Sequence, residues 1–204
     1  MNSEHHRLVA WRGTEPRRID VAHLWLGEDR LTAHGSSTSA DCVVTYRVDT
    51  DPQWMTTALD VRVDDADGWR SLALRRHQNR SWSATRCSWQ DPSRWFEIEL
   101  PDLDGALDCD LGLCPVTNTM PVRREGILAA SQRHEPRYAE LLMAWVAVPE
   151  LIVTASPQRY DAGTPIAGGG AQIRFASGGF VEHIEVDADG VVVSYPSIGN
   201  QLVA

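Results

Sequence analysis

An alternation of apolar and charged residues over positions 58–64 limits most strongly what this chain can fold into. Leu59, Val61 and Val63 are separated by charged side chains, so the pattern has a period of two. In a β-strand that period places the aliphatic side chains on one face and the charged ones on the other. Asp67-Gly68 follows, and this dipeptide favours the backbone angles of a tight hairpin. The segment therefore predicts a strand with one buried and one solvated face, followed by a returning strand.

The same arrangement recurs near the carboxyl end of the chain. Residues 181–186 are followed by Asp187-Ala188-Asp189-Gly190 and then by residues 191–195. The two copies indicate either an internal duplication or two hairpins that use the same turn chemistry. The Gly- and Pro-rich residues 161–170 predict a loop. Other short runs bounded by turn-forming residues predict strands at residues 24–26, 42–48, 69–75, 80–87, 95–100, 127–130, 151–156 and 172–176.

This succession of about ten or more short strands, with few credible helices, sets the expected fold class. We expect a mainly β protein in which a single antiparallel meander is curled into a roll or half-barrel with few short helices. At 204 residues the chain can bury one substantial core, and β domains of that size often remain undivided. A single domain over residues 1–204 is therefore expected.

The charge and hydropathy of the chain exclude several functions. The formal net charge is −9 and all 19 basic residues are arginine, so we expect no nucleic acid partner, because phosphate backbones are bound by clustered cations. No apolar run approaches the ~18 residues of a transmembrane segment. The first residues lack the apolar core of a secretory signal, which predicts a cytoplasmic protein. In that compartment the four cysteines would be reduced.

Residues 104–124 combine acidic, small polar and arginine side chains between apolar runs. Several of these side chains carry hydroxyl, amide or guanidinium groups, which match sugar hydroxyls or phosphate. The resulting candidate ligand-binding residues are Thr117, Asn118, Thr119, Arg123 and Arg124. The alternative is a structural turn in which Asn118 caps backbone groups and the arginines pair with surface acids.

Asp108 and Asp110 complete the candidate set. Two positions apart, they would share one face of a strand, where one carboxylate could raise the proton affinity of the other as acid–base chemistry requires. Equally, both could be solvated. Cys109 and Cys114 lack the spacing of zinc ligands, and no second pair follows, so buried thiols are expected. The sequence indicates no metal, no cofactor and no assigned catalytic residue.

Tryptophan is abundant in the chain, with eight residues. Indole rings fill cores, but their faces also line apolar ligand cavities and stack on the C–H faces of sugars. We expect about two or three of the eight to line a binding site.

Two adjoining motifs connect the chain to a known family: Asp108-Cys109-Asp110-Leu111 and Pro115-Val116-Thr117-Asn118-Thr119-Met120-Pro121-Val122-Arg123-Arg124. With further landmarks at Val148-Pro149-Glu150-Leu151 and Gln158-Arg159-Tyr160, the chain resembles the bacterial family of uncharacterised proteins described as putative glycolipid-binding. The resemblance implies an antiparallel β-roll or half-barrel, similar to lipoprotein carriers, with an apolar concavity that takes acyl chains. It also implies a strand over residues 138–148, where the spacing of apolar residues alone favours a helix.

One main hypothesis and two alternatives follow. The main hypothesis is a non-enzymatic protein that binds a lipid or glycolipid in an apolar concavity of a β-roll. The first alternative is an enzyme that acts on a sugar conjugate or small lipophile through Asp108 and Asp110. It would require both carboxylates in a pocket, with a strongly raised proton affinity for at least one of them. The second is a protein interaction domain without a small ligand, marked by a large exposed apolar patch.

Overall fold

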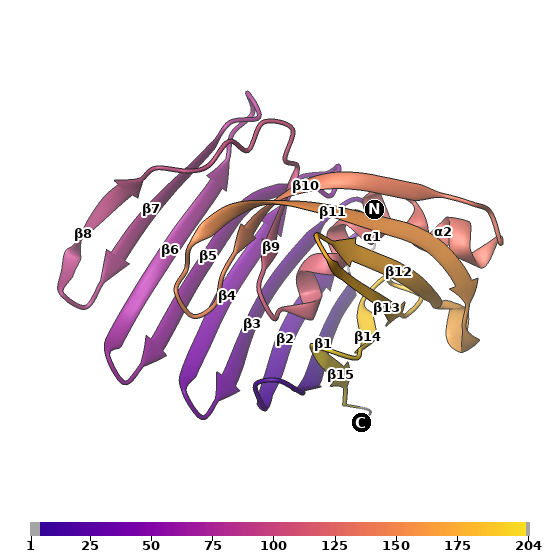
Figure 1. Cartoon of the computed structure of the whole chain (residues 1–204), viewed down its shortest axis with the longest axis horizontal. Helices are drawn as coiled ribbons and strands as arrows, with labels where there is room; N and C mark the ends of the chain where they lie inside the picture. Colours follow the sequence, from indigo (N-terminus) through magenta and orange to yellow (C-terminus); the bar gives the residue numbers. More distant parts are fainter. Residues whose placement is uncertain (1–4, 203–204) are drawn as a thin grey trace.

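A computed structural model describes residues 5–202, which form one fifteen-stranded sheet (Figure 1). Neighbouring strands follow the order β8-β7-β6-β5-β4-β3-β2-β1-β15-β14-β13-β12-β11-β10-β9. The strands are β1 (His5–Gly13), β2 (Arg18–Leu26), β3 (Leu31–Ser39), β4 (Cys42–Thr50), β5 (Thr56–Asp65), β6 (Gly68–Arg76), β7 (Trp82–Ser88), β8 (Asp91–Ile98), β9 (Asp108–Leu111), β10 (Tyr138–Val146), β11 (Val153–Pro165), β12 (Ala171–Ser177), β13 (Phe180–Val186), β14 (Val192–Tyr195) and β15 (Gly199–Gln201). The helical segments are η1 (Pro115–Asn118), α1 (Thr119–Arg124), α2 (Ile127–Gln132) and η2 (Ala167–Gly169).

Strand β5 confirms the period of two. Its residues Leu59, Val61 and Val63 are buried, whereas the charged residues between them remain partly accessible. β6 returns after a tight turn in which Asp65 pairs with Gly68. Gly68 has a φ of 117°, a conformation that glycine adopts without steric cost.

The second predicted hairpin joins β13 to β14. The carboxylate of Asp187 accepts hydrogen bonds from the backbone N–H groups of Asp189 and Val191. Gly190 has a φ of 80°. A side chain that binds its own backbone two residues on is the usual chemistry of an Asp-initiated turn. This predicted hairpin is therefore confirmed.

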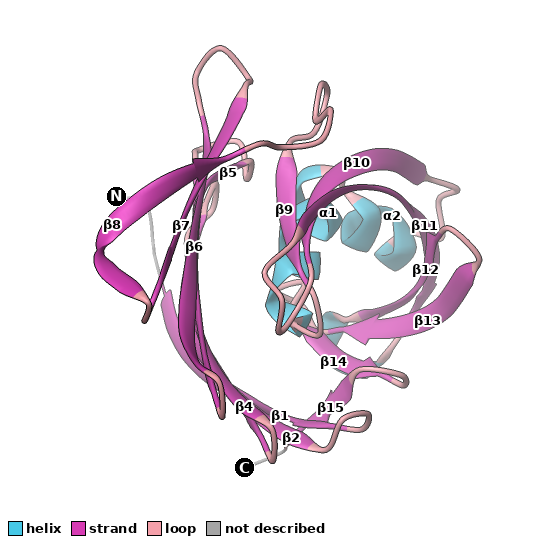
Figure 2. Ribbon diagram, turned by 60° about the vertical axis from the view of Figure 1, so that its left-hand side comes forward, coloured by secondary structure: helices cyan, strands magenta, loops and turns pink. Residues whose placement is uncertain are grey.

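The sheet curls without closing into a barrel (Figure 2). β1–β8 form a broad twisted layer, while β10–β13 wind around α1 and α2. The predicted mainly β, curled meander with few short helices is confirmed. Among the described strands it departs from antiparallel order at one pair, β9 with β10, which is parallel.

β9 is an edge strand that lies on the inside of the curl. It is tied to β5 through Thr56, whose backbone N–H donates to the carbonyl of Leu107 at 3.1 Å. The Thr56 hydroxyl in turn accepts a 3.0 Å hydrogen bond from the backbone N–H of Cys109. The strand that carries Asp108 and Asp110 is therefore fixed from both sides, by β10 and by β5.

Three local predictions meet different outcomes. The strand predicted at residues 127–130 is wrong, because these residues begin α2. Gly126, with a φ of 66°, turns the chain before Ile127. A short apolar run is compatible with either a strand or a helix. Residues 138–146 form strand β10, as the family resemblance implied. The predicted loop at residues 161–170 is wrong over its first half, since β11 continues to Pro165 with a bulge after Asp161.

Two hydrophobic clusters form the interior. The larger lies between the inner face of β1–β7 and residues 103–120, and it includes Cys109 and Leu111. The smaller lies within the second half of the curl, among α2 and β10–β14. Since side chains alternate along a strand, Asp108 and Asp110 share the face of β9 turned away from the larger cluster. No helix within residues 5–202 combines the length and apolar character needed to span a bilayer.

Candidate functional site: an open groove with a polar floor

An open groove of about 700 Å³ lies on the concave side of the second half of the curl. We call it the groove. It is bounded by β9, η1 and β10–β14 together with the segments 112–114 and 197–198 and residues 148 and 178. Its lining combines polar side chains with aromatic and aliphatic ones. The polar residues are Asp110, Asn118, Thr154, Ser156, Gln158, Ser177 and Ser197, and the larger apolar ones are Leu111, Leu113, Trp145, Val148, Phe175, Phe180, Tyr195 and Ile198.

Asp110 is held at the floor of the groove by two neutral hydrogen-bond donors. The hydroxyl of Thr117 donates to Oδ1 at 2.7 Å, and Nε2 of Gln158 donates to Oδ2 at 2.6 Å. Burial raises the pKa of Asp110, and these two hydrogen bonds oppose the rise. Each carboxylate oxygen can accept a further hydrogen bond, so the floor offers acceptors to a ligand hydroxyl.

Tyr160 connects Gln158 with Asn118 beneath the groove. Its hydroxyl oxygen lies 3.0 Å from Oδ1 of Asn118 and 3.1 Å from Oε1 of Gln158. A phenol carries one proton and donates to one of these oxygens at a time. The other amide oxygen retains acceptor capacity for a ligand. Asn118 and Gln158 also line the groove, so this network presents amide groups beside the Asp110 carboxylate.

Aromatic rings form the adjoining wall. Phe175 makes edge-to-face contacts with Tyr160, Phe180 and Tyr195 at centroid distances of 5.1, 6.1 and 6.0 Å. Trp145, from β10, lines the groove as well. Phe180 is 41% exposed, so an apolar edge remains open to a ligand. Flat aromatic surfaces beside hydrogen-bonding groups suit the two faces of a sugar ring.

Asp108 does not line the groove. It is fully buried and accepts two hydrogen bonds from Nη1 of Arg124, at 2.7 and 2.6 Å. Burial raises its pKa to about 6 even though Arg124 opposes the shift. Arg124 also donates from Nε to Glu125 at 2.9 Å. This ion pair fastens α1 to β9 below the floor of the groove.

Arg123 is likewise occupied elsewhere. Its guanidinium lies over the ring of Trp54, 4.9 Å from the centroid, and donates to the carbonyl of Asp189 at 3.2 Å. Thr119 is fully buried, and its hydroxyl has no hydrogen-bond partner among residues 5–202. Of the seven residues expected to bind ligand, Asp110 and Asn118 line the groove and Thr117 positions Asp110. Asp108, Thr119, Arg123 and Arg124 lie outside it.

The groove also contains residues that the sequence did not indicate. Gln158, Phe175 and Tyr195 lie far along the chain from Asp110 and reach it through the curl of the sheet. Gln158-Arg159-Tyr160 belongs to the motifs that carry the family resemblance, but it was not assigned to a binding site. Because Gln158 and Tyr160 are two positions apart in β11, they share one face, and that spacing was the usable indication.

The cysteines near the groove are unsuited to nucleophilic attack. Burial raises the pKa of Cys114 to about 12, and burial also raises the pKa of Cys109. The thiolate is the reactive form of cysteine, so both side chains remain protonated thiols near neutral pH. Within residues 5–202 no three His, Cys, Asp or Glu side chains gather as metal ligands.

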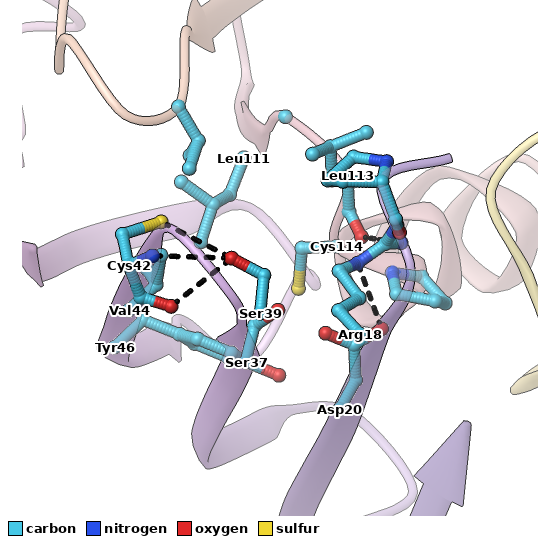
Figure 3. Close-up of a pocket in the computed structure, with 14 residues that line it drawn as sticks. Arg18, Asp20, Ser37, Ser39, Cys42, Val44, Tyr46, Leu111, Leu113 and Cys114 are labelled. Atoms are coloured by element: carbon cyan, nitrogen blue, oxygen red, sulfur yellow. Dashed lines mark hydrogen bonds and ion pairs between the residues drawn. The ribbon is translucent and has the colours of Figure 1, made fainter. Parts of the chain in front are cut away.

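A second, smaller and more enclosed cavity lies behind the segment Leu111–Cys114, which it shares with the groove (Figure 3). Its volume is about 40 Å³, and its lining is mainly apolar, with Val44 and Tyr46 from β4. Since ~10–15 Å³ measured in this way holds one water, the cavity has room for a few waters and not for an acyl chain. The difference in volume between this cavity and the groove of about 700 Å³ therefore favours the groove as the ligand site.

Arg18 closes this cavity towards the surface. Its guanidinium group donates to the carbonyls of Leu113 and Ile198 at 2.9 and 3.0 Å and pairs with Asp20 at 3.1 Å. Figure 3 shows Arg18 and Asp20 on one side of the cavity, with Cys114 projecting between them and Ser37. One side chain thus ties β2 to the 111–114 segment and to Ile198.

Residues 8–200 match a family model described as "Putative glycolipid-binding". The fold is similar to the crystal structure of a DUF1089 family protein from Pseudomonas aeruginosa, with a TM-score of 0.63 and 23% sequence identity. That similarity covers 90% of this chain and 92% of the other, and at this identity it shows the fold alone. No curated protein matches the chain.

Proposed function

Since the chain belongs to the family described as "Putative glycolipid-binding", we propose that it binds the sugar head group of a glycolipid in the groove. The observation that carries the proposal is the pairing of a hydrogen-bonding floor, formed by Asp110, Asn118 and Gln158, with an aromatic wall. A sugar ring has hydroxyl groups at its edge and C–H groups on its faces. Both sets of groups find partners in the groove.

The aliphatic part of the ligand would lie along Leu113, Val148 and Ile198, which line the groove beside the aromatic rings. Because the smaller cavity has a volume of only about 40 Å³, we assign recognition mainly to the head group and not to an enclosed acyl chain. Each neutral hydrogen bond contributes ~0.5–1.5 kcal/mol net, and association costs several kcal/mol. We expect dissociation constants on the order of micromolar to millimolar.

Calorimetric titration with hexyl β-glucoside, hexyl β-galactoside and hexyl β-mannoside tests the proposal. At least one should bind to the wild-type protein. Trp145→Leu removes an indole from the groove and should weaken that binding by about tenfold, given ~1 kcal/mol for an aromatic contact. Trp95→Leu is the matched control, since Trp95 is 50% exposed on the edge strand β8. Equal binding by both variants, or no binding of any glycoside to wild type, would refute the proposal.

The geometry does not favour the hydrolytic alternative. Glycoside hydrolysis ordinarily uses two carboxyl groups that flank the scissile bond. Of the described residues that line the groove, Asp110 is the only carboxylate, and Asp108 is engaged by Arg124 below it. We expect no release of free sugar when the protein is incubated with the same glycosides.

A further inference from the structure

We propose that the groove selects uncharged, hydroxyl-rich head groups and rejects those that carry phosphate or sulfate. This inference rests on the proposed function and names its ligand class. Glycolipids of both kinds share a sugar and an alkyl chain, so the distinction depends on the charges that face the head group.

No cation lines the groove among the described residues, although the chain contains 19 arginines. Arg124, behind the floor, is neutralised by Asp108 and Glu125. Arg123 lies over Trp54. Arg18 is 4% exposed and donates to backbone carbonyls. Sites that bind phosphate ordinarily present arginine or lysine to it, and here these three arginines are already engaged by other groups.

The one formally charged side chain among the described residues of the groove is the acidic Asp110. Its carboxylate would repel a phosphate placed on the same floor, and in a partly buried site this repulsion is screened less than at an open surface. A sugar hydroxyl, by contrast, can donate to the same oxygens. Asp110 therefore favours an uncharged sugar head group and opposes a phosphorylated one.

The rest of the polar lining is neutral. Thr154, Ser156, Ser177 and Ser197 contribute hydroxyls, and those of Ser156 and Ser177 lie 3.1 Å apart. Hydroxyls and amides can both donate and accept, so they adapt to the mixed donors and acceptors of a sugar. They do not compensate the charge of an anion.

The test compares hexyl β-glucoside with hexyl β-glucoside 6-phosphate by calorimetry at 0.15 M salt, where charges beyond ~8 Å are screened. If the galactoside or mannoside proves the better neutral probe, its 6-phosphate is used. The neutral glycoside should bind at least about tenfold more tightly, equal to ~1.4 kcal/mol. Asp110→Asn should narrow the ratio to about threefold or less by improving binding of the phosphate.

Asp104→Asn is the matched control, because Asp104 is exposed in the loop before β9 and the substitution changes the net charge equally. Its selectivity ratio should equal that of wild type. A second variant, Ser156→Arg, places a cation in the groove and should increase affinity for the phosphate, which keeps the test informative if Asp110→Asn folds poorly.

Binding of the phosphate as tight as that of the neutral probe overturns the selectivity and leaves sugar binding intact. The proposed selectivity is also overturned if Asp104→Asn changes the affinity ratio as much as Asp110→Asn, since the net charge of the protein and not the charge in the groove would then set the ratio. If neither probe binds, the proposed function and this inference fail together.

Discussion

At the scale of single residues, two side chains that the sequence indicates as ligand-binding, Arg124 and Asp108, form an ion pair with each other. Asp108 is fully buried and Arg124 nearly so. Removing one partner of a buried pair leaves an uncompensated charge, which costs much more than the pair itself contributes.

Arg124→Ala should therefore lower the free energy of unfolding by ~3–5 kcal/mol. Urea denaturation followed by circular dichroism measures the change. Arg133→Ala serves as the control, because Arg133 pairs with Glu135 on the surface, where both side chains are more than half exposed. Little change in the free energy of unfolding is expected for Arg133→Ala. A similar loss for both variants would show that burial of the pair is not what matters.

The pKa of Asp108 gives a prediction for pH. Its pKa in the fold is about 6, above the ordinary 3.8, so between these values the native state binds a proton that the unfolded state does not. Stability from this group is complete below pH ~4 and is lost as the pH rises through ~6. Because the unfolded carboxyl is still partly protonated at pH 4, the wild type should lose about 2 kcal/mol relative to Asp108→Asn between pH 4 and 7. The free energies of unfolding of wild type and Asp108→Asn are measured at pH 4 and pH 7. An equal change in both proteins would contradict the raised pKa of Asp108.

At the scale of elements, the 111–114 segment separates the groove from the smaller cavity, and Arg18 fastens it from β2. Gly13 makes room for this arginine, since a Cβ at Gly13 would lie 2.4 Å from Cγ of Arg18. The absence of a side chain at Gly13 therefore leaves the space in which Arg18 reaches the carbonyl of Leu113.

Gly13→Ala should displace Arg18 and destabilise the protein by ~1–3 kcal/mol, as overpacking does. Backbone amides of residues 112–114 should also exchange faster with deuterium, because the Leu113 carbonyl loses its partner. Gly179→Ala is the control, as its Cβ would meet nothing within 4 Å. Unchanged exchange at residues 112–114 would show that Arg18 does not hold this segment.

Most strands could be predicted because turn residues and a period of two are local properties of the sequence. The failure at residues 127–130 has a physical cause: four apolar residues fit a buried strand or helix equally, and packing within the curl decides. The groove was half predictable. Asp110 and Asn118 lie within one notable segment, but Gln158, Phe175 and Tyr195 join them only through the fold. Arg123 and Arg124 were expected to bind ligand because their residue type is visible in the sequence, whereas the partners that hold them outside the groove are not.

At the scale of the whole molecule, the curl encloses a small cavity and leaves the larger space as an open groove. A fully buried methylene contributes ~0.8 kcal/mol, or about fourfold in affinity. An alkyl chain in an open groove would bury about half of its surface, so each added methylene should tighten binding about twofold. Titrations with butyl, hexyl and octyl glycosides below their micellar concentrations measure the increment. A fourfold step would indicate that the chain becomes enclosed.

The order of the sheet has a consequence for connectivity. β1 and β15 are neighbours in its middle, with Trp11 opposite Gln201, while the consecutive strands β8 and β9 lie at opposite edges. Spatial order is thus a circular shift of chain order. A permutant with a short glycine linker from residue 202 to residue 5, opened at residues 102–104, would trace the strands in succession from edge to edge. Its pairing of β1 with β15 would become local, so the permutant should refold faster than the parent while keeping the same groove.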